Sequence, residues 1–369
     1  MNICFIKIDM SEKGGSERIA CLLMNEFYKI EGYNIHCLTY NLKNKKIAYE
    51  LNSNIKVEVL GKNKRLRYSF FSILREMKDY IQKENIDIII NIGTGESIVS
   101  SFLKIVFKKK IKIITCEHSN LLNRYDSKKK RIAQFIGSTF SNKIITLTQK
   151  DKENFEKKFK LKDKKVEYIY NFIDEKLLDN KNEYNSRSKK IISVGRLEKV
   201  KGFDRLIEIA KIVFEDKVTE KWEWHIYGEG PERESLENII RKYNLEKKVI
   251  LKGNVENIYE LYKEYSFYVM TSYFEGLPMV LLEAKANSLP IISFDINTGP
   301  SEIIRDGVDG YLVRNEDIWK MSKKIIELIK AEDMRINFSL NTKRNLYKFN
   351  KNKILKKWKK ILEEVYEDK

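Results

Sequence analysis

The chain has 369 residues, carries a formal net charge of +18 and is 42% hydrophobic. This length exceeds the usual size of one hydrophobic core and predicts about two domains. Four scattered cysteines without a Cys-x-x-Cys pair argue against a disulfide framework and a thiolate zinc site, and no apolar stretch approaches the ~20 residues that span a bilayer. The first residues enter a strand-like run and not a signal peptide, so we expect a protein of the reducing cytoplasm.

The positive charge is concentrated in the first half of the chain. Residues 1–185 carry 36 Lys and Arg against 23 Asp and Glu, whereas residues 186–369 carry 35 against 30. Lys, Asn and Ile are abundant while Pro and Gly are scarce, which indicates that part of the surplus is compositional. We find no zinc finger, aromatic RNA-binding strand or concentrated basic helix with a dimer seam, and therefore expect no nucleic-acid partner.

In chain order, the first half alternates strand-like and helical patterns. The strand-like runs are Ile3–Ile8, Asn34–Thr39, Lys56–Leu60, Ile86–Ile92, Lys112–Cys116, Lys143–Leu147 and Lys165–Tyr170. Helical patterns between them include Glu17–Ile30, Tyr68–Lys83 and Lys128–Ser138. This alternation predicts a parallel sheet built from βαβ units.

The second half repeats the alternation after a polar, aperiodic segment, Asp174–Lys190, which we interpret as a linker. Its strand-like runs are Lys190–Val194, Trp222–Tyr227, Val249–Lys252, Ser266–Thr271, Pro290–Phe294 and Gly310–Val313. A helix is expected from Met279 through Ala286, with Pro278 suited to a first helical position and Glu283 in the second turn. The last stretch, Lys351–Tyr366, has the spacing of an amphipathic helix.

Residues with chemical potential recur where the predicted strands end. In an open parallel sheet, ligands bind at the carboxyl ends of the strands. The residues at these ends are Gly14 and Gly15, His118, Arg196, Gly228 to Gly230, Gly253 and Glu275. We expect them to line one edge of each sheet, with one cleft between two facing domains.

These motifs together resemble the retaining glycosyltransferases of family 4, which have the GT-B fold. The resemblance covers nearly the whole chain: Gly14-Gly15-Ser16-Glu17-Arg18, Glu117-His118, Tyr170-Asn171-Phe172-Ile173-Asp174, Val194-Gly195-Arg196-Leu197 through Lys201-Gly202, Gly228-Glu229-Gly230-Pro231, Gly253, Glu275 to Glu283, and Gly299-Pro300-Ser301-Glu302-Ile303-Ile304 through Asp306-Gly307. It implies an α/β protein with two Rossmann-like, doubly wound parallel-sheet domains facing a central cleft. Residues 1–178, completed by a C-terminal helix at 351–369 that crosses back, would bind the acceptor, and residues 179–350 the nucleotide sugar.

A nucleotide-sugar donor requires neutralisation of its diphosphate as it becomes the leaving group. Metal-dependent transferases often use an Asp-x-Asp motif, which this chain lacks. Arg196 offers a planar fork of donors, Lys201 a compact charge, and the helix starting near Pro278 free N–H groups and a positive dipole end. We therefore expect a metal-independent reaction without a cofactor.

The remaining roles are implied by the resemblance. Glu283 would accept hydrogen bonds from the ribose, Glu275 would meet the donor sugar, and His118 would reach the transferred sugar; the two carboxylates would not act as the acid and base of a glycosidase. Retention would follow front-face attack, with the leaving phosphate taking the acceptor's proton. Further donor-binding residues would be Gly276, Leu277, Pro278, Met279, Gly228, Gly230, Gly253 and Asn254, and phosphate or acceptor contacts would come from Gly14, Gly15 and Asn171.

The expected activity is transfer of a hexose or N-acetylhexosamine, with UDP as the expected nucleotide, to a polyprenyl-linked saccharide. The turn Thr298-Gly299-Pro300-Ser301-Glu302 resembles members that build bacterial surface polysaccharides such as capsule or lipopolysaccharide. Two alternatives stay open: an epimerase of the same fold, which would bind the same donor and transfer nothing, and transfer to a soluble or protein acceptor.

Two clusters in the first half combine basic and apolar residues. Lys62, Lys64, Arg65 and Arg67 precede Tyr68, Phe70, Phe71, Ile73 and Leu74, while Phe102, Leu103, Ile105, Val106 and Phe107 precede Lys108, Lys109, Lys110 and Lys112. Such combinations suit an anionic membrane surface. The competing interpretation is that helices of α/β domains bury one apolar face. We expect peripheral attachment of the first domain to the inner face of the plasma membrane.

Overall fold

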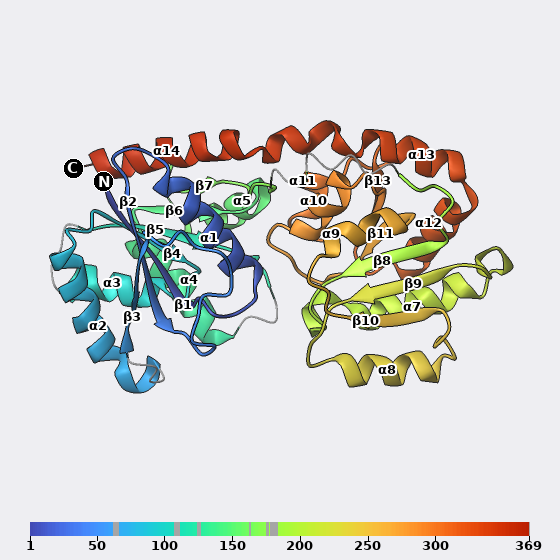
Figure 1. The fold of residues 1–369 in the computed structure, drawn as a ribbon, viewed down its shortest axis with the longest axis horizontal. Coiled ribbons are helices and arrows are strands. Elements are labelled where there is room, and N and C mark those ends of the chain that lie inside the picture. Colours follow the sequence, from blue (N-terminus) through green and yellow to red (C-terminus); the bar gives the residue numbers. More distant parts are fainter. Residues whose placement is uncertain are drawn as a thin grey trace. The chain divides into compact units, whose positions relative to one another are not determined.

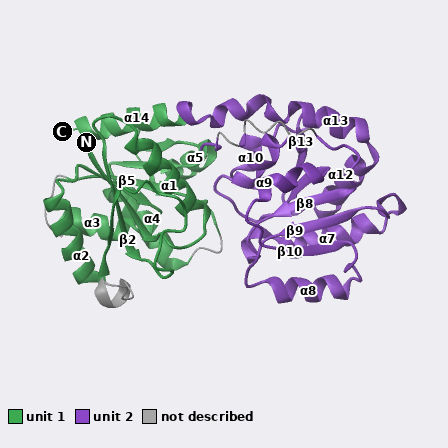
Figure 2. Ribbon diagram, in the orientation of Figure 1, with its two compact units in different colours: residues 1–171, 354–369 green, residues 172–353 purple. Residues whose placement is uncertain are grey.

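The computed structural model describes residues 1–61, 66–106, 111–123, 127–161, 164–174, 177 and 184–368, without the side chains of 66–69 and 106. The described chain divides into two compact units (Figure 2). Unit 1 comprises Met1–Asn171 with Ile354–Lys369, and unit 2 comprises Phe172–Lys353. No helix of the described residues is long and apolar enough to cross a bilayer.

Unit 1 is built on a parallel sheet in the order β3-β2-β1-β4-β5-β6-β7 (Figure 1). Its strands are β1 (Asn2–Asp9), β2 (Asn34–Asn41), β3 (Lys56–Val59), β4 (Ile88–Ile92), β5 (Lys112–Glu117), β6 (Lys143–Thr146) and β7 (Val166–Tyr168). The helices are α1 (Gly15–Tyr28), α2 (Leu66–Lys83), α3 (Ser97–Val106), α4 (Lys128–Phe140) and α5 (Gln149–Phe159). The strand order reverses between β1 and β4, which is the switch point where open α/β sheets bind ligands.

The two faces of β1 are covered by different helices. Cys4 and Ile6 belong to a buried core that continues into α2 and α3. Phe5 points to the other face, where its ring centroid lies 5.8 Å from that of Phe27 in α1. The alternation along the strand follows the two-residue period of a pleated strand, so β1 is buried on both sides.

The last helix, α14 (Lys351–Glu367), completes the α1 side of unit 1. Its buried residues are Ile354, Trp358, Ile361, Leu362 and Val365. The Trp358 ring packs edge-on against Phe27, with centroids 6.0 Å apart. Lys143 of β6 pairs with Glu364 at 3.2 Å. The apolar stripe predicted in this stretch therefore covers the core beneath α1.

Unit 2 is built on a second parallel sheet, in the order β10-β9-β8-β11-β12-β13. Its strands are β8 (Lys190–Val194), β9 (Glu223–Tyr227), β10 (Val249–Gly253), β11 (Phe267–Met270), β12 (Ile291–Asp295) and β13 (Gly310–Arg314). The helices are α7 (Phe203–Phe214), α8 (Arg233–Lys242), α9 (Ile258–Leu261), α10 (Met279–Ala286), α11 (Pro300–Ile303), α12 (Ile318–Lys330) and α13 (Glu332–Asn341), with short 3₁₀ turns that include η2 (Lys199–Lys201) and η5 (Thr342–Phe349). Here the order reverses between β8 and β11.

The prediction of two doubly wound parallel sheets is confirmed, and each predicted strand is present within two residues of its expected ends. Two boundaries differ. Unit 1 ends at Asn171 and not at 178, because the Ile173 amide already bonds to the Phe349 carbonyl of unit 2 at 3.1 Å. Pro278 is the N-cap of α10 and not its first residue, since its ψ of 95° is extended.

We predict that Trp358→Ala lowers the free energy of unfolding of unit 1 by about 3–5 kcal/mol, because it removes a large buried ring from α14. Urea unfolding measures the change. The control is Lys356→Ala on the exposed side of the same helix, which should shift stability by less than about 0.5 kcal/mol. Equal stability of the two variants would contradict the packing role of α14.

Candidate active site

The switch point of unit 2 brings a lysine and a glutamate together. Lys201 follows β8, Glu275 follows β11, and these strands are neighbours. The Lys201 Nζ lies 2.8 Å from the Glu275 Oε1, which also accepts a 2.6 Å hydrogen bond from the Ser272 hydroxyl. The side chains are 26% and 12% exposed, so both are partly accessible. The arrangement is a cation held by one carboxylate at a partly open sheet edge.

The loops after β8 and β9 pack backbone to backbone beside this pair. A Cβ added to Gly228 would lie 1.9 Å from the Gly195 carbonyl oxygen, and one at Gly230 would lie 2.4 Å from that of Leu197. Gly228 also donates its N–H to the carbonyl of Gly253 at 2.9 Å. Glycine is therefore required at 228 and 230 by contacts within the protein, before any ligand is considered.

The N-terminus of α10 lies next to Glu275 along the chain. Leu277 and Pro278 are buried, and Met279 is the first helical residue. The turn before the helix contacts the segment that follows β12. The Thr298 hydroxyl donates to the Glu275 carbonyl at 2.6 Å, and a Cβ at Gly299 would lie 2.5 Å from Pro278 Cδ. The first N–H groups of a helix have no partner within it, so this terminus can bind an anion.

Glu283 lies in α10 and is 4% exposed, so it is a buried carboxylate and not a surface residue. The hydroxyl of Tyr259, in α9, donates to its Oε1 at 3.3 Å. Burial raises the pKa of the Tyr268 phenol, and the charges of Glu275 and Glu283 raise it further. The two glutamates thus share one neighbourhood around the end of β11.

Arg196 does not join this cluster. Its side chain is 65% exposed and pairs with Glu198 on the same loop, with Nε 3.1 Å from Oε1. Gly253 ends β10 in a left-handed conformation, with φ of 75°, and Asn254 follows it on the surface. Both lie at the carboxyl edge of the sheet, as expected from the strand pattern.

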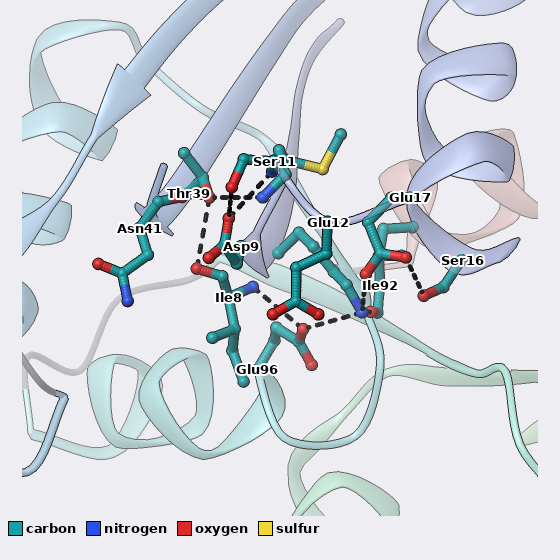
Figure 3. A network of polar contacts seen from close by, with 12 residues as sticks. Ile8, Asp9, Ser11, Glu12, Ser16, Glu17, Thr39, Asn41, Ile92 and Glu96 are labelled. Carbon is teal, nitrogen blue, oxygen red and sulfur yellow. Dashed lines mark hydrogen bonds and ion pairs between the residues drawn. The ribbon is translucent and has the colours of Figure 1, made fainter. Parts of the chain in front are cut away.

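The switch point of unit 1 carries a second cluster of charges (Figure 3). The Lys7 amine, from β1, lies 3.3 Å from Glu17 at the start of α1 and 3.5 Å from Glu96, which follows β4. In Figure 3 the carboxylates of Glu17 and Glu96 point toward the same amine. Burial opposes the charge of Lys7, but the two carboxylates outweigh it and raise its pKa, whereas burial raises the pKa of Glu96.

Gly14 is the N-cap of α1 and Gly15 is its first residue, so both precede Glu17 of this cluster along the chain. A Cβ at Gly14 would meet Glu17 Oε2 at 2.2 Å, while Gly15 has open space around it. A side chain at 14 would therefore push the Glu17 carboxylate from its place beside Lys7, whereas the space at Gly15 leaves room for a ligand.

His118 follows β5, and its imidazole is held neutral. Burial and the charge of Lys7 lower its pKa to about 3. Its Nε2 is buried and has no hydrogen-bond partner among the described residues. Asn171, after β7, is 8% exposed. These residues belong to unit 1, and the carboxylates and cations of the α10 site belong to unit 2.

Two buried acids, Glu117 at the end of β5 and Asp151 in α5, influence each other in unit 1. Asp151, in the first turn of α5, is 1% exposed, and its Oδ1 accepts a hydrogen bond from the Leu121 amide nitrogen at 3.1 Å. Burial and the nearby Glu117 raise its pKa to about 7. Glu117 accepts a 3.1 Å hydrogen bond from Gln134 and lies 4.0 Å from the Lys130 amine.

Several residues that complete these clusters lie outside the sequence motifs. They are Tyr259, Ser272 and Thr298 in unit 2 and Lys7 and Glu96 in unit 1. Lys7 carried a usable signal, because a lysine inside an apolar strand run needs a buried partner. The hydroxyl residues carried none, since Tyr, Ser and Thr are common at such positions.

Comparison with known proteins identifies the family. The model "Glycosyltransferase Family 4" matches residues 13–177, and "Glycosyl transferases group 1" matches residues 174–345. The amylovoran biosynthesis glycosyltransferase AmsD of Erwinia amylovora is 31% identical, over 96% of this chain and 97% of its own length. The chain belongs to the same glycosyltransferase family as AmsD. A poly(ribitol-phosphate) alpha-N-acetylglucosaminyltransferase of Staphylococcus aureus is 30% identical over 59% of this glycosyltransferase and 43% of its own length.

Solved structures share the fold of this glycosyltransferase. TarM superposes with a TM-score of 0.84 at 18% identity, covering 100% of this chain and 99% of TarM. The pneumococcal O-GlcNAc transferase GtfA, solved with UDP and GlcNAc, gives a TM-score of 0.79 at 17% identity, with coverages of 100% and 99%. The GT-B fold predicted from the sequence motifs is therefore confirmed.

We predict that the contribution of Asp151 to the stability of unit 1 is lost as the pH rises from about 4 to 7. The folded pKa of Asp151, about 7, lies above its ordinary value of 3.8, so the folded state favours the protonated acid. That contribution is complete below pH 4 and is lost as the pH rises through 7. Asp151→Asn should flatten this part of the stability profile and stabilise unit 1 above pH 7 by at most about 4 kcal/mol.

Thermal unfolding between pH 4 and 8 measures this effect, with exposed Asp79→Asn as the control. The control should follow the wild-type profile. A profile of Asp151→Asn parallel to wild type over the whole range would show that Asp151 does not titrate with folding.

Proposed function

We propose that this glycosyltransferase moves a hexose or N-acetylhexosamine from a UDP-sugar to a saccharide acceptor, without a metal ion and with retention of the anomeric configuration. The observation that carries the proposal is the contact between Lys201 and Glu275 next to the N-terminus of α10. A cation and a helix N-terminus suit a diphosphate. A neighbouring carboxylate suits the hydroxyls of a sugar.

In the proposed reaction the diphosphate binds between Lys201 and the N–H groups that begin α10. Lys201 exchanges part of its contact with Glu275 for phosphate oxygens, which frees Glu275 for the sugar. Fixed donors of this kind stabilise the charge that develops as the sugar–phosphate bond breaks. The leaving phosphate takes the proton of the attacking acceptor hydroxyl, so no side-chain base is needed. The buried carboxylate of Glu283, which Tyr259 contacts, accepts hydrogen bonds from the ribose hydroxyls.

The relatives support the donor class. GtfA was solved with UDP and GlcNAc, and the HepE protein of Anabaena with UDP and glucose. Incubation with UDP-sugars, with and without acceptor, tests the proposal by the release of UDP. Release that requires the acceptor fits transfer, whereas interconversion of two nucleotide sugars without release fits the epimerase alternative.

For the acceptor, we propose a polyprenyl-linked saccharide used in assembly of a bacterial surface polysaccharide, reached at an anionic membrane. The support is an exposed face of α4. Ile132 and Phe135 are 57% and 60% exposed there, beside exposed Lys128 and Arg131. These positions recur every three to four residues and lie on one side of the helix.

The neighbouring helices extend this surface. α3 packs against both α2 and α4. It exposes Phe102 and Ile105 by 41% and 50%, and α2 exposes Phe71 by 81%. Aromatic and basic residues side by side suit a membrane interface. We call Phe71, Phe102, Ile105, Ile132 and Phe135, with Lys128, Lys129 and Arg131, the α2–α4 face.

Part of the surface inferred from the sequence is not available to a membrane. Ile73, Leu74 and Leu103 are core residues, at 0%, 4% and 0% exposure, because they fill the space between α2, α3 and the sheet. Lys62, Lys64, Arg65, Phe107, Lys108, Lys109 and Lys110 lie outside the described residues, as do the side chains of Arg67, Tyr68 and Val106.

We predict that Lys201→Ala lowers kcat/KM by about 30-fold or more, since the diphosphate loses a charged partner. Arg196→Ala should also reduce transfer, because we expect the Arg196 side chain to leave Glu198 and bind the donor diphosphate. Lys199→Ala, on the same turn but paired with Asp204, is the control and should retain most activity. Activity that disappears with EDTA, or wild-type rates in both test variants, would contradict the metal-independent site.

We predict different kinetic effects for the two glutamates. Glu283→Gln should weaken donor binding by about 10-fold with little change in kcat, because ribose contacts are equal before and during reaction. Glu275→Gln should lower kcat by about 100-fold, because its contact strengthens in the transition state. Initial rates against donor concentration separate these effects. Unchanged donor affinity in Glu283→Gln would remove the ribose role.

We predict that the protein co-sediments with vesicles containing anionic lipid and that salt weakens this binding. Ile132→Ser with Phe135→Ser, and separately Lys128→Gln with Arg131→Gln, should each reduce binding. Trp319→Ser in α12, which is 64% exposed in unit 2, is the matched control and should bind as wild type. Equal recovery on neutral vesicles would remove the electrostatic part, and no recovery would favour an acceptor in solution.

A further inference from the structure

We propose that Arg205, buried beneath the loop that follows β11, is a positioning residue that holds Ser272 and Glu275 against Lys201. This inference rests on the proposed function of that pair. Arg205 lies in the first turn of α7 and is 3% exposed, so its guanidinium cannot contact a substrate directly. Its effect on the reaction must pass through the backbone that it binds.

The guanidinium binds the backbone where β11 ends. Its Nε donates to the Thr271 carbonyl and its Nη2 to the Ser272 carbonyl. Its Nη1 donates to the Asn315 amide oxygen at 2.9 Å, beyond the end of β13. One planar fork therefore fixes two consecutive carbonyl groups of the loop and anchors them to another part of unit 2.

Two aromatic rings fix the plane of this fork. The Arg205 Cζ lies 4.1 Å from the ring centroid of Tyr273 and 4.1 Å from that of Phe294. Tyr273 follows β11 and Phe294 lies in β12. A lysine at 205 would keep the charge, but its donors sit on a single nitrogen, which cannot reproduce the planar arrangement of three donor nitrogens that Arg205 uses. The site thus distinguishes arginine from lysine.

The loop is also tied directly to the segment that carries Lys201. The Tyr273 amide donates to the Val200 carbonyl at 2.8 Å, and the Tyr273 hydroxyl donates to Asp204 at 3.2 Å. A Cβ at Gly202 would lie 2.2 Å from the Thr271 carbonyl oxygen, so the two segments touch without an intervening side chain. Arg205 holds the carbonyls of Thr271 and Ser272 at this same junction, so its contacts act on the segment that sets the distance between Lys201 and Glu275.

The position of the reactive carboxylate follows from these contacts. The Ser272 carbonyl is held by Arg205, and the hydroxyl of the same residue donates to the Glu275 Oε1 at 2.6 Å. Lys201 binds that oxygen from the opposite segment. Loss of the fork would therefore shift Ser272 and Glu275 together, while the rest of the sheet keeps its own ladder.

Arg335 provides a matched control within unit 2. It is also a buried guanidinium, at 1% exposure, and donates to the carbonyls of Leu328, Ile329 and Ser186. It also stacks on an aromatic ring, that of Trp222, at 5.4 Å. However, Ser186 and Trp222 precede β8 and β9, and Leu328 and Ile329 lie in the last turn of α12, so Arg335 lies away from the loops that follow β8 and β11.

The test compares R205K with R335K in the full chain. Both should lower the melting temperature, because each loses buried hydrogen bonds. R205K alone should lower kcat by about 10-fold or more with little change in donor KM, since a displacement of reacting groups by about 1 Å can cost about 100-fold. In a Glu275→Gln background, R205K should add less than about 2-fold, because both changes act through one carboxylate. F294L, which removes one stacked ring, is the second variant if R205K does not fold.

Hydrogen exchange supplies a readout that does not depend on activity. R205K should speed exchange in residues 271–276 and R335K should not. Equal kinetics and equal exchange at 271–276 in the two variants would overturn the positioning role, as would additive losses in the Glu275→Gln background. A wild-type protein that transfers no sugar would overturn the proposed function, whereas faster exchange at 271–276 in R205K would still support the link between Arg205 and the loop.

Discussion

The contact on which the candidate site depends is the ion pair between Lys201 and Glu275 across two neighbouring strands. It forms where the order of the second sheet reverses, because the connections of β8 and β11 leave the sheet in opposite directions and their loops meet at its edge. The first sheet has a similar ion pair. Lys7 of β1 contacts Glu96, which follows β4, where the strand order of that sheet reverses. Each unit therefore gathers charged residues where the strand order of its sheet reverses.

Close backbone packing explains the glycines beside the cluster of unit 2. Gly228 lies against the carbonyl of Gly195, and Gly230 lies against that of Leu197. In each case a side chain would displace part of the protein itself. The glycine motifs thus record how tightly adjacent loops approach, and this tight approach is what brings charged residues of separate strands within hydrogen-bonding distance.

The two clusters differ in how they carry charge. In unit 2 the cation and carboxylate remain partly exposed, so a charged ligand can compete for them. In unit 1, burial keeps His118 neutral, with a pKa of about 3, and the carboxylates share a single amine. An imidazole in this state can donate or accept a hydrogen bond without a change of charge near neutral pH. Such a group suits an uncharged sugar hydroxyl better than a phosphate.

The two parallel sheets follow from the residue pattern, since alternating apolar strands and amphipathic helices leave few other ways to bury both faces. The same pattern puts Glu275, His118 and the glycines at strand ends. Which of these residues meet depends on how the strands are ordered in space. Lys201 and Glu275 are separated by 74 positions, and a residue pattern with a period of two or 3.6 carries no information about which strands become neighbours. For the same reason, the sequence alone does not distinguish Arg205 from a surface arginine of an amphipathic helix. In the fold, carbonyl groups and two aromatic rings surround its guanidinium.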